Sequence, residues 1–122
     1  MKIRFSILFF FVSSLMQIAA VNEEIVLSNC SNQHNHNDYY PPADMPEVYY
    51  DADLLEIIIY ADGFAGYYDL DIISLSTMSA HISTRISGYG EIIDISLLPD
   101  DDYKIVITSS NNNVYEGQFT NY

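Results

Sequence analysis

The stretch Tyr67–Ser74, which reads Tyr-Tyr-Asp-Leu-Asp-Ile-Ile-Ser, decides the fold of this chain of 122 residues. Apolar and polar side chains alternate along it, and a period of two is typical of a β-strand with one buried and one solvated face. The buried set is expected to be Tyr68, Leu70 and Ile72, and the solvated set Tyr67, Asp69 and Asp71. An antiparallel sheet with one wet side is therefore expected.

Short apolar runs of the same kind lie on both sides of this stretch. Leu54–Tyr60 is apolar on both faces apart from Glu56, which is typical of a central strand. Turn signals separate the runs, and the strongest of them is the dipeptide at residues 62–63, Asp-Gly. The other expected strands are Val48–Tyr50 at a sheet edge, His81–Ser87, Ile92–Leu97, Tyr103–Thr108 and Val114–Thr120.

These runs predict an all-β domain of about seven strands, with turns about every 8 to 12 residues and no helix. The pattern is typical of an antiparallel β-sandwich. A closed β-barrel is the alternative, because strand count and alternation do not separate the two architectures. The chain has one Cys, so an internal disulfide is excluded and the apolar core has to hold the domain together.

Residues 1–20 predict a signal peptide for export. Lys2 and Arg4 form a basic start, and Phe5–Met16 is an apolar run that is too short to span a bilayer. Small residues follow, and we expect cleavage between Ala20 and Val21; an uncleaved membrane anchor is the alternative. The mature protein is then expected in the periplasm, on the outer surface or outside the cell, without membrane insertion.

Residues 21–47 predict a flexible polar arm in front of a β-sandwich domain over residues 48–122. The arm is rich in Asn, Ser, His and acids, and polar residues without periodicity cannot offset the entropy cost of ordering. Leu27–Cys30 resembles a lipoprotein acylation box, but it lies too far behind the apolar run. Cys30 is therefore expected to be a bystander, with lipid attachment or an intermolecular disulfide as the alternatives.

The charge balance excludes one class of partner. The chain has 17 Asp and Glu against 4 Lys and Arg, and its formal net charge is −13. Two of the basic residues lie in the expected signal peptide, so the mature surface lacks a basic patch. Nucleic acid and anionic lipid are therefore not expected as partners.

Metal ligands occur in the chain without the spacing that a folded site needs. His34, His36 and Asp38 have the donor types of a zinc or copper site, but the expected arm supplies no fixed geometry. Asp51, Asp53 and the run Asp100–Asp102 offer oxygen ligands for Ca²⁺, yet the Gly and the distal Glu of a calcium loop are missing. Turn chemistry is the better explanation, and we expect no metal and no cofactor.

Catalytic residues are not expected either. Ser79 lies close to His81 in the sequence, but the context of a nucleophilic serine is missing. His81 is expected on a wet strand face. No feature places two carboxylates across a cleft, and a sandwich of this size offers little concave volume. The sequence therefore favours a protein that is not an enzyme.

The tyrosine content favours ligand binding over catalysis, because the tyrosine ring combines an apolar face with a hydroxyl group. The chain has 11 Tyr and no Trp. The outward side of the strand at residues 67–74 is the candidate ligand-binding surface, with Tyr67, Asp69 and Asp71 as its residues. Cross-strand packing that only stabilises the sheet is the alternative.

Several segments together resemble a known family. They are Val48–Asp51, Leu54–Ile57, Ile86–Tyr89, Ile93–Pro99, Tyr103–Ile107 and Val114–Phe119. This pattern is similar to the DUF3244 family of short secreted Bacteroidota proteins, over nearly all of residues 48–122. The resemblance implies an immunoglobulin-like β-sandwich without an assigned activity. More loosely, the turn Leu98–Tyr103 resembles the sorting domains of type nine secretion, with Asp101 at their glycine position.

Together these observations predict a secreted, non-enzymatic interaction module of unknown ligand at the bacterial cell envelope. Its partner would be a protein or a glycan. The alternatives are a carbohydrate-binding domain, with or without calcium, and a domain that acts in secretion sorting.

Overall fold

The computed structural model describes residues 22–30, 43–61 and 64–122. The described residues form strands and turns, and none of them forms a helix long and apolar enough to cross a bilayer. The strands are β1 (Asn22–Ile25), β2 (Ser28–Asn29), β3 (Glu47–Asp51), β4 (Glu56–Tyr60), β5 (Tyr67–Ser74), β6 (Ala80–Ser87), β7 (Gly90–Asp94), β8 (Asp101–Ser109) and β9 (Val114–Asn121).

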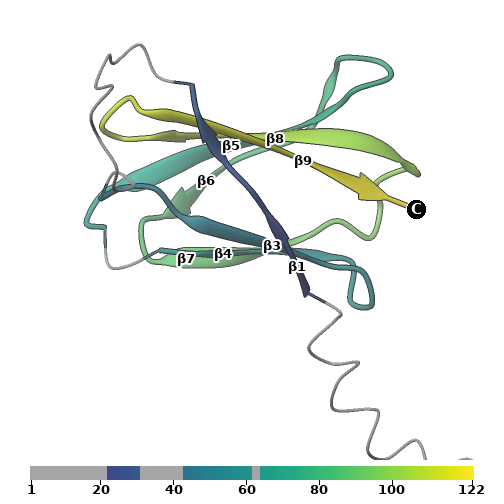
Figure 1. Ribbon diagram of the computed structural model, residues 1–122, viewed down its shortest axis with the longest axis horizontal. Helices are drawn as coiled ribbons and strands as arrows, with labels where there is room; N and C mark the ends of the chain where they lie inside the picture. The colour runs from purple at the N-terminus through teal and green to yellow at the C-terminus, as the bar shows by residue number, and fades with distance from the viewer. Residues whose placement is uncertain (1–21, 31–42, 62–63) are drawn as a thin grey trace, which may run out of the picture.

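The strands form two stacked sheets, as Figure 1 shows. The four-stranded sheet has the order β1-β3-β4-β7, and the five-stranded sheet has the order β2-β9-β8-β5-β6. All pairings are antiparallel. The predicted β-sandwich is confirmed.

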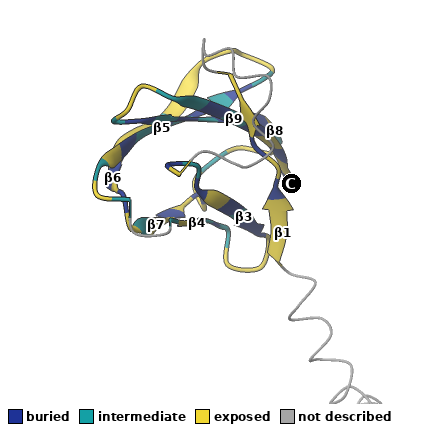
Figure 2. Cartoon of the chain, turned by 60° about the vertical axis from the view of Figure 1, so that its left-hand side comes forward, coloured by how far each residue is buried: buried dark blue, intermediate teal, exposed yellow. Residues whose placement is uncertain are grey.

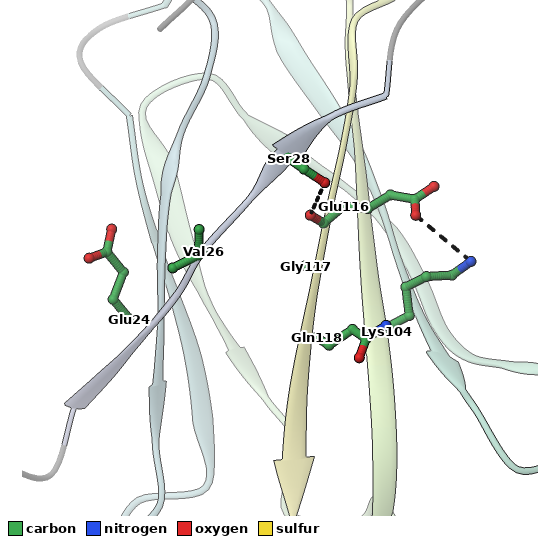
Figure 3. A pocket seen from close by; sticks show the side chains of 7 residues that line it. All are labelled: Glu24, Val26, Ser28, Lys104, Glu116, Gly117 and Gln118. Carbon is green, nitrogen blue, oxygen red and sulfur yellow. Dashed lines mark hydrogen bonds and ion pairs between the residues drawn. The ribbon is translucent and has the colours of Figure 1, made fainter.

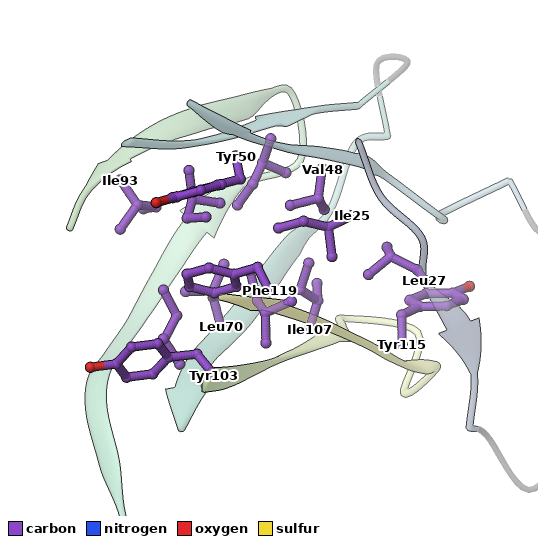
Figure 4. Packing of buried hydrophobic residues seen from close by; sticks show 14 of the residues in the cluster. Ile25, Leu27, Val48, Tyr50, Leu70, Ile93, Tyr103, Ile107, Tyr115 and Phe119 are labelled. Carbon is purple, nitrogen blue, oxygen red and sulfur yellow. The ribbon is translucent and has the colours of Figure 1, made fainter. Parts of the chain in front are cut away.

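Alternation along the strands builds the core between the sheets. In β5 every second residue is buried, beginning with Tyr68, as the sequence predicted. The same period in β8 buries Tyr103, Ile105 and Ile107. Figure 4 shows side chains of both sheets meeting between the layers, with Tyr50 of β3 facing Phe119 of β9. Their ring centroids are 5.4 Å apart. Burial of these side chains is the main favourable term in folding.

The seven strands expected between residues 48 and 122 are present as β3 to β9, and β1 and β2 precede them in the sequence. The expectation of a flexible arm is wrong for residues 22–30. β1 pairs with β3 and β2 pairs with β9, so one short segment passes from one sheet to the other. Ile25 and Leu27 enter the core and keep only 4% and 9% of their exposure. Backbone pairing and these two side chains order a segment that is otherwise polar.

Gly117 of β9 leaves room for this crossing. A Cβ atom at this position would lie 2.6 Å from Cγ2 of Ile25 and 3.0 Å from the carbonyl oxygen of Val26. Both distances are shorter than ordinary van der Waals contact. The N-terminal segment therefore lies against the backbone of β9 because position 117 has no side chain.

Several strand bounds differ from the sequence prediction. β7 ends at Asp94 instead of Leu97, where the Asp94 carboxylate accepts the backbone N–H of Ser96. β4 begins at Glu56 instead of Leu54, because the Asp51 carboxylate accepts the backbone N–H groups of Asp53 and Leu54 and holds a turn. Leu55 completes this turn with a φ of 55°. In addition, β3 is not an edge strand, since β1 covers its outer side.

Some predictions fall outside the described residues. These are the signal peptide over residues 1–20, the histidine and aspartate group of His34, His36 and Asp38, and the turn at residues 62–63.

Candidate functional site

The predicted ligand-binding residues Tyr67, Asp69 and Asp71 lie together on the outer face of β5. Each of them contacts a residue of the neighbouring strand β6. The guanidinium group of Arg85 donates to both carboxylate oxygens of Asp69, from Nε at 2.8 Å and from Nη2 at 3.2 Å. Its Cζ atom lies 3.9 Å from the ring centroid of Tyr67. Ser83 donates a hydrogen bond to Asp71.

These contacts give each of the three residues a partner within the sheet, and Arg85 neutralises the charge of Asp69. Hydrogen bonds from Arg85 hold the pKa of Asp69 below its ordinary value. The Tyr67 ring, which is 39% exposed, already carries a cation on one side. The arrangement stabilises the β5–β6 pair, and an incoming ligand would have to compete with Arg85 for both groups.

The outer face of the four-stranded sheet presents a different surface, which we call the acidic-rimmed face. Its residues are Glu24, Glu47, Tyr49, Glu56, Ile58, Tyr60, Ile92 and Asp94. The strand register aligns Glu24, Tyr49, Ile58 and Ile92 in one row across β1, β3, β4 and β7. Figure 2 shows the exposed course of β1 at the edge of this sheet.

Apolar groups occupy the middle of the acidic-rimmed face. Tyr60 and Ile92 keep 57% and 58% of their exposure, and Ile58 between them is partly exposed. The Tyr49 ring meets the Tyr60 ring edge to face, with centroids 5.8 Å apart. Aromatic and branched side chains thus form a contiguous patch on a sheet that no further layer covers in the described part of the chain.

Carboxylates border this patch without a cation of their own. Among the described residues, the basic side chains are Arg85 and Lys104, and both lie on the five-stranded sheet. The Tyr49 hydroxyl donates to Oε1 of Glu47 at 2.9 Å. This bond, together with the charges of Glu47 and Glu24, raises the pKa of Tyr49.

The sequence interpretation missed this face, although a signal was present. Leu54–Tyr60 is apolar on both faces apart from Glu56, which predicts a central strand. In the structure Ile57 and Ile59 are buried, whereas Ile58 and Tyr60 face outward. The outward apolar residues of an internal strand are the feature that would have identified the patch.

The carboxylate of Asp44 is buried in a network of hydrogen bonds. Asp44 keeps 3% of its exposure and accepts hydrogen bonds from Ser109, Asn113 and Tyr115. Burial by itself would raise the pKa of Asp44, but these hydrogen bonds outweigh it and hold the pKa below its ordinary value. The Tyr68 hydroxyl donates to the Asp44 carbonyl oxygen, and burial raises the pKa of Tyr68 to about 12.

The Asp44 network ties the segment before β3 to the turn between β8 and β9. Neutral hydroxyl and amide donors surround the carboxylate. A buried carboxylate whose two oxygens both accept hydrogen bonds in this way holds a structure together and offers little to a ligand.

The aspartates considered for calcium are spread over the end of β3, the start of β8 and the turns next to them. Asp51 accepts backbone N–H groups of its own turn, and Asp102 accepts the Thr120 hydroxyl. Asp101 accepts the hydroxyl groups of Ser74 and Ser76 at 2.7 Å and 2.5 Å. Within residues 22–30, 43–61 and 64–122, no three His, Cys, Asp or Glu side chains come together as a metal site.

His81 is exposed and lies at an irregularity of the β5–β6 pair. Its ring meets the ring of Tyr103 edge to face at 5.9 Å. Ser79, the nearby hydroxyl in the sequence, is hydrogen-bonded to the Thr77 hydroxyl. The two residues therefore have separate partners.

A groove of about 480 Å³ follows the line where the N-terminal segment crosses β9. Figure 3 shows its lining: Glu24, Val26, Ser28, Lys104, Glu116, Gly117 and Gln118. Lys104 Nζ lies 4.0 Å from Oε1 of Glu116, and the Ser28 hydroxyl donates to the Glu116 carbonyl oxygen. Cys30, exposed and with a free thiol, donates its backbone N–H to Val114 just beyond this groove. The groove is open to solvent and its one ammonium group is paired.

Comparison with known proteins supports the architecture. No protein family model and no curated protein matches the sequence. Among solved structures, the chain is similar to a DUF3244 family protein with an immunoglobulin-like β-sandwich fold from Bacteroides vulgatus. The two share 16% sequence identity with a TM-score of 0.63, over 83% of this chain and 99% of that one. The chain therefore has an immunoglobulin-like β-sandwich fold.

Proposed function

We propose that this protein is an exported, non-enzymatic interaction module that binds a partner at the cell envelope through the acidic-rimmed face. The observation that carries the proposal is the patch of Tyr49, Ile58, Tyr60 and Ile92. Tyr60 and Ile92 are exposed and Tyr49 and Ile58 are partly exposed on a regular sheet. Contiguous exposed patches of this kind are typical of interaction sites.

The chemistry of the described side chains also favours binding over catalysis. The carboxylates with lowered pKa values include Asp44, Asp69 and Asp101, and each is held by hydrogen-bond donors within the molecule. A general base or nucleophile requires a group that can exchange a proton with a substrate. Immunoglobulin-like sandwiches carry many unrelated functions, so the face rather than the fold supports this assignment.

The surface around Tyr67 is the second candidate, because it lies on a solvated sheet face and contains an aromatic ring followed by two carboxylates. Arg85 occupies it in the structure. Binding there would require the Arg85 side chain to move. A Tyr67→Ala variant therefore tests this surface separately.

The test is capture of envelope components by mature protein, residues 21–122, immobilised through its C-terminus. The double variant Tyr60→Ser/Ile92→Ser is expected to lose the captured partner. The matched control is Tyr89→Ser/Leu97→Ser, which removes two side chains that are 71% and 95% exposed and lie in turns. Capture that persists in the first variant and disappears in Tyr67→Ala would move the site to β5.

A further inference from the structure

We propose that the partner of the acidic-rimmed face is a cationic segment of a protein, with Lys or Arg side chains placed around an apolar centre. This inference rests on the proposed function and names the chemistry of the partner. It follows from the positions of the carboxylates and from a contact that the molecule makes on its other face.

The carboxylates border the apolar row on several sides. Glu24 ends the row on β1, beside Tyr49. Glu47 lies opposite Tyr60 in the register of β3 and β4, and Glu56 lies opposite Asp94 in the register of β4 and β7. Neighbouring strands are about 4.8 Å apart, so the row from β1 to β7 extends roughly 14 Å. A short protein segment can cover this distance.

Like charges without a counterion repel one another, and an incoming cation relieves this repulsion. The effect grows when the apolar patch excludes water, because Coulomb interactions are stronger at lower dielectric constant. A neutral ligand covering the same patch would leave the carboxylates uncompensated and partly desolvated. Charge complementarity therefore favours a basic partner over a neutral one.

The five-stranded sheet shows the expected mode of recognition within the same molecule. There Arg85 places its guanidinium over the Tyr67 ring and binds both oxygens of Asp69. Tyr60 and Glu47 also lie next to each other on the acidic-rimmed face, directly opposite across β4 and β3, and no described residue supplies the cation. An Arg or Lys side chain of a partner would stack on the ring of Tyr60 and pair with Glu47 in the same way.

The acidic-rimmed face combines carboxylates with apolar side chains, and this combination favours a protein segment over a metal ion. A small metal ion would not cover Ile58 and Ile92, and no three carboxylates converge among the described residues. Anionic lipid and nucleic acid would be repelled. A protein segment that combines Lys or Arg with Leu, Val or aromatic side chains satisfies both the rim and the centre.

The experiment uses defined probes and mature protein, residues 21–122. The first probe is an eight-residue peptide that alternates Lys with Leu, and the second replaces each Lys by Nε-acetyl-lysine. Binding is measured by calorimetry and by NMR shift perturbation at low salt and at physiological salt. We expect the Lys peptide to bind at least tenfold more tightly than the acetylated one, with perturbed amides confined to β1, β3, β4 and β7.

Two pairs of variants separate a site from general attraction to an acidic protein. Glu24→Gln/Glu47→Gln is expected to weaken Lys-peptide binding about tenfold, whereas Asp100→Asn/Asp102→Asn removes the same charge elsewhere and is expected to leave binding within twofold. Likewise, Tyr60→Ser/Ile92→Ser is expected to weaken binding, and Tyr89→Ser/Leu97→Ser is not. Equal weakening by both charge variants would overturn the inference.

The inference and the proposed function can fail separately. If Tyr60→Ser/Ile92→Ser abolishes capture of the envelope partner but capture is insensitive to salt and to Glu24→Gln/Glu47→Gln, the partner is not cationic and only this inference is overturned. Saturable binding of a neutral oligosaccharide, xylohexaose, to the same amides in place of the Lys peptide would have the same consequence. If capture of the envelope partner is unchanged in Tyr60→Ser/Ile92→Ser, the proposed function is overturned, and the inference that rests on it is overturned as well.

Discussion

The buried carboxylate of Asp44 accepts a hydrogen bond from the hydroxyl group of Tyr115, which lies 71 residues further along the chain. Ser109 and Asn113 donate to the same carboxylate. One negative charge is thus held by neutral donors of the β8–β9 hairpin, and this contact fixes how the chain enters β3.

Replacing Asp44 by Ala is expected to lower the free energy of unfolding by about 2 to 3 kcal/mol, because the buried Ser109 and Tyr115 and the half-buried Asn113 lose their acceptor. Urea denaturation of both proteins measures the difference. Asp100→Ala, at an exposed position in a turn, is the control and is expected to change stability by less than about 0.5 kcal/mol. A stability of Asp44→Ala equal to that of the control would show that the network is not stabilising.

Stability should also depend on pH through Asp44. Its pKa is lower in the folded protein than the ordinary value of 3.8, so its contribution is complete above that value and is lost as the pH falls through the folded pKa. The Asp44→Asn variant lacks this contribution. The difference in unfolding free energy between wild type and variant is therefore expected to be constant from pH 7 to about pH 5 and to shrink below about pH 4. A difference that grows on acidification would contradict the assignment.

Replacing Gly117 by Ala is expected to displace the N-terminal segment from β9 and to cost about 1 to 3 kcal/mol. The new methyl group would overlap Ile25 and the backbone of Val26. Hydrogen exchange measures the effect locally, with faster exchange expected in residues 22–30 than in the rest of the domain. Gln118→Ala, at the exposed neighbouring position, should leave exchange in this segment unchanged.

Replacing Arg85 by Gln is expected to lower the midpoint of thermal unfolding only slightly, because both partners of its ion pair with Asp69 are exposed to solvent. Thermal unfolding measures this loss. A larger effect would mean that the contact with the Tyr67 ring contributes more than exposed cation–π pairs usually do.

Export predicts a defined N-terminus. Protein recovered outside the cytoplasm is expected to begin at Val21, one residue before β1, and N-terminal sequencing checks this. Ala20→Arg should block cleavage. A protein that retains residues 1–20 would instead support the membrane-anchor alternative.

Much of the fold could be predicted from local alternation. β5, β8 and β9 carry long alternating patterns, and the sequence of β5 predicts its inward side chains correctly. The sequence does not predict β1 and β2, because both strands are short and polar. Ile25 and Leu27 are the apolar residues of this segment that are buried. The pairing of β1 and β2 with β3 and β9 joins residues far apart in the sequence, which local patterns do not encode.

The candidate sites were less predictable than the fold. Alternation placed Tyr67, Asp69 and Asp71 on one outer face, but the role of Arg85 depends on the register that sets it opposite Asp69. The acidic-rimmed face depends on three registers at once, and on which side of β4 remains uncovered. Such relations require the assembled sheet.

The passage of residues 22–29 from one sheet to the other has a consequence for proteolysis. A single cut that releases this segment would strip a strand from both layers together and leave β3 and β9 with bare backbone donors and acceptors. Unprotected borders of that sort recruit strands from neighbouring molecules. Resistance to aggregation in this protein therefore depends on keeping its first few ordered residues attached.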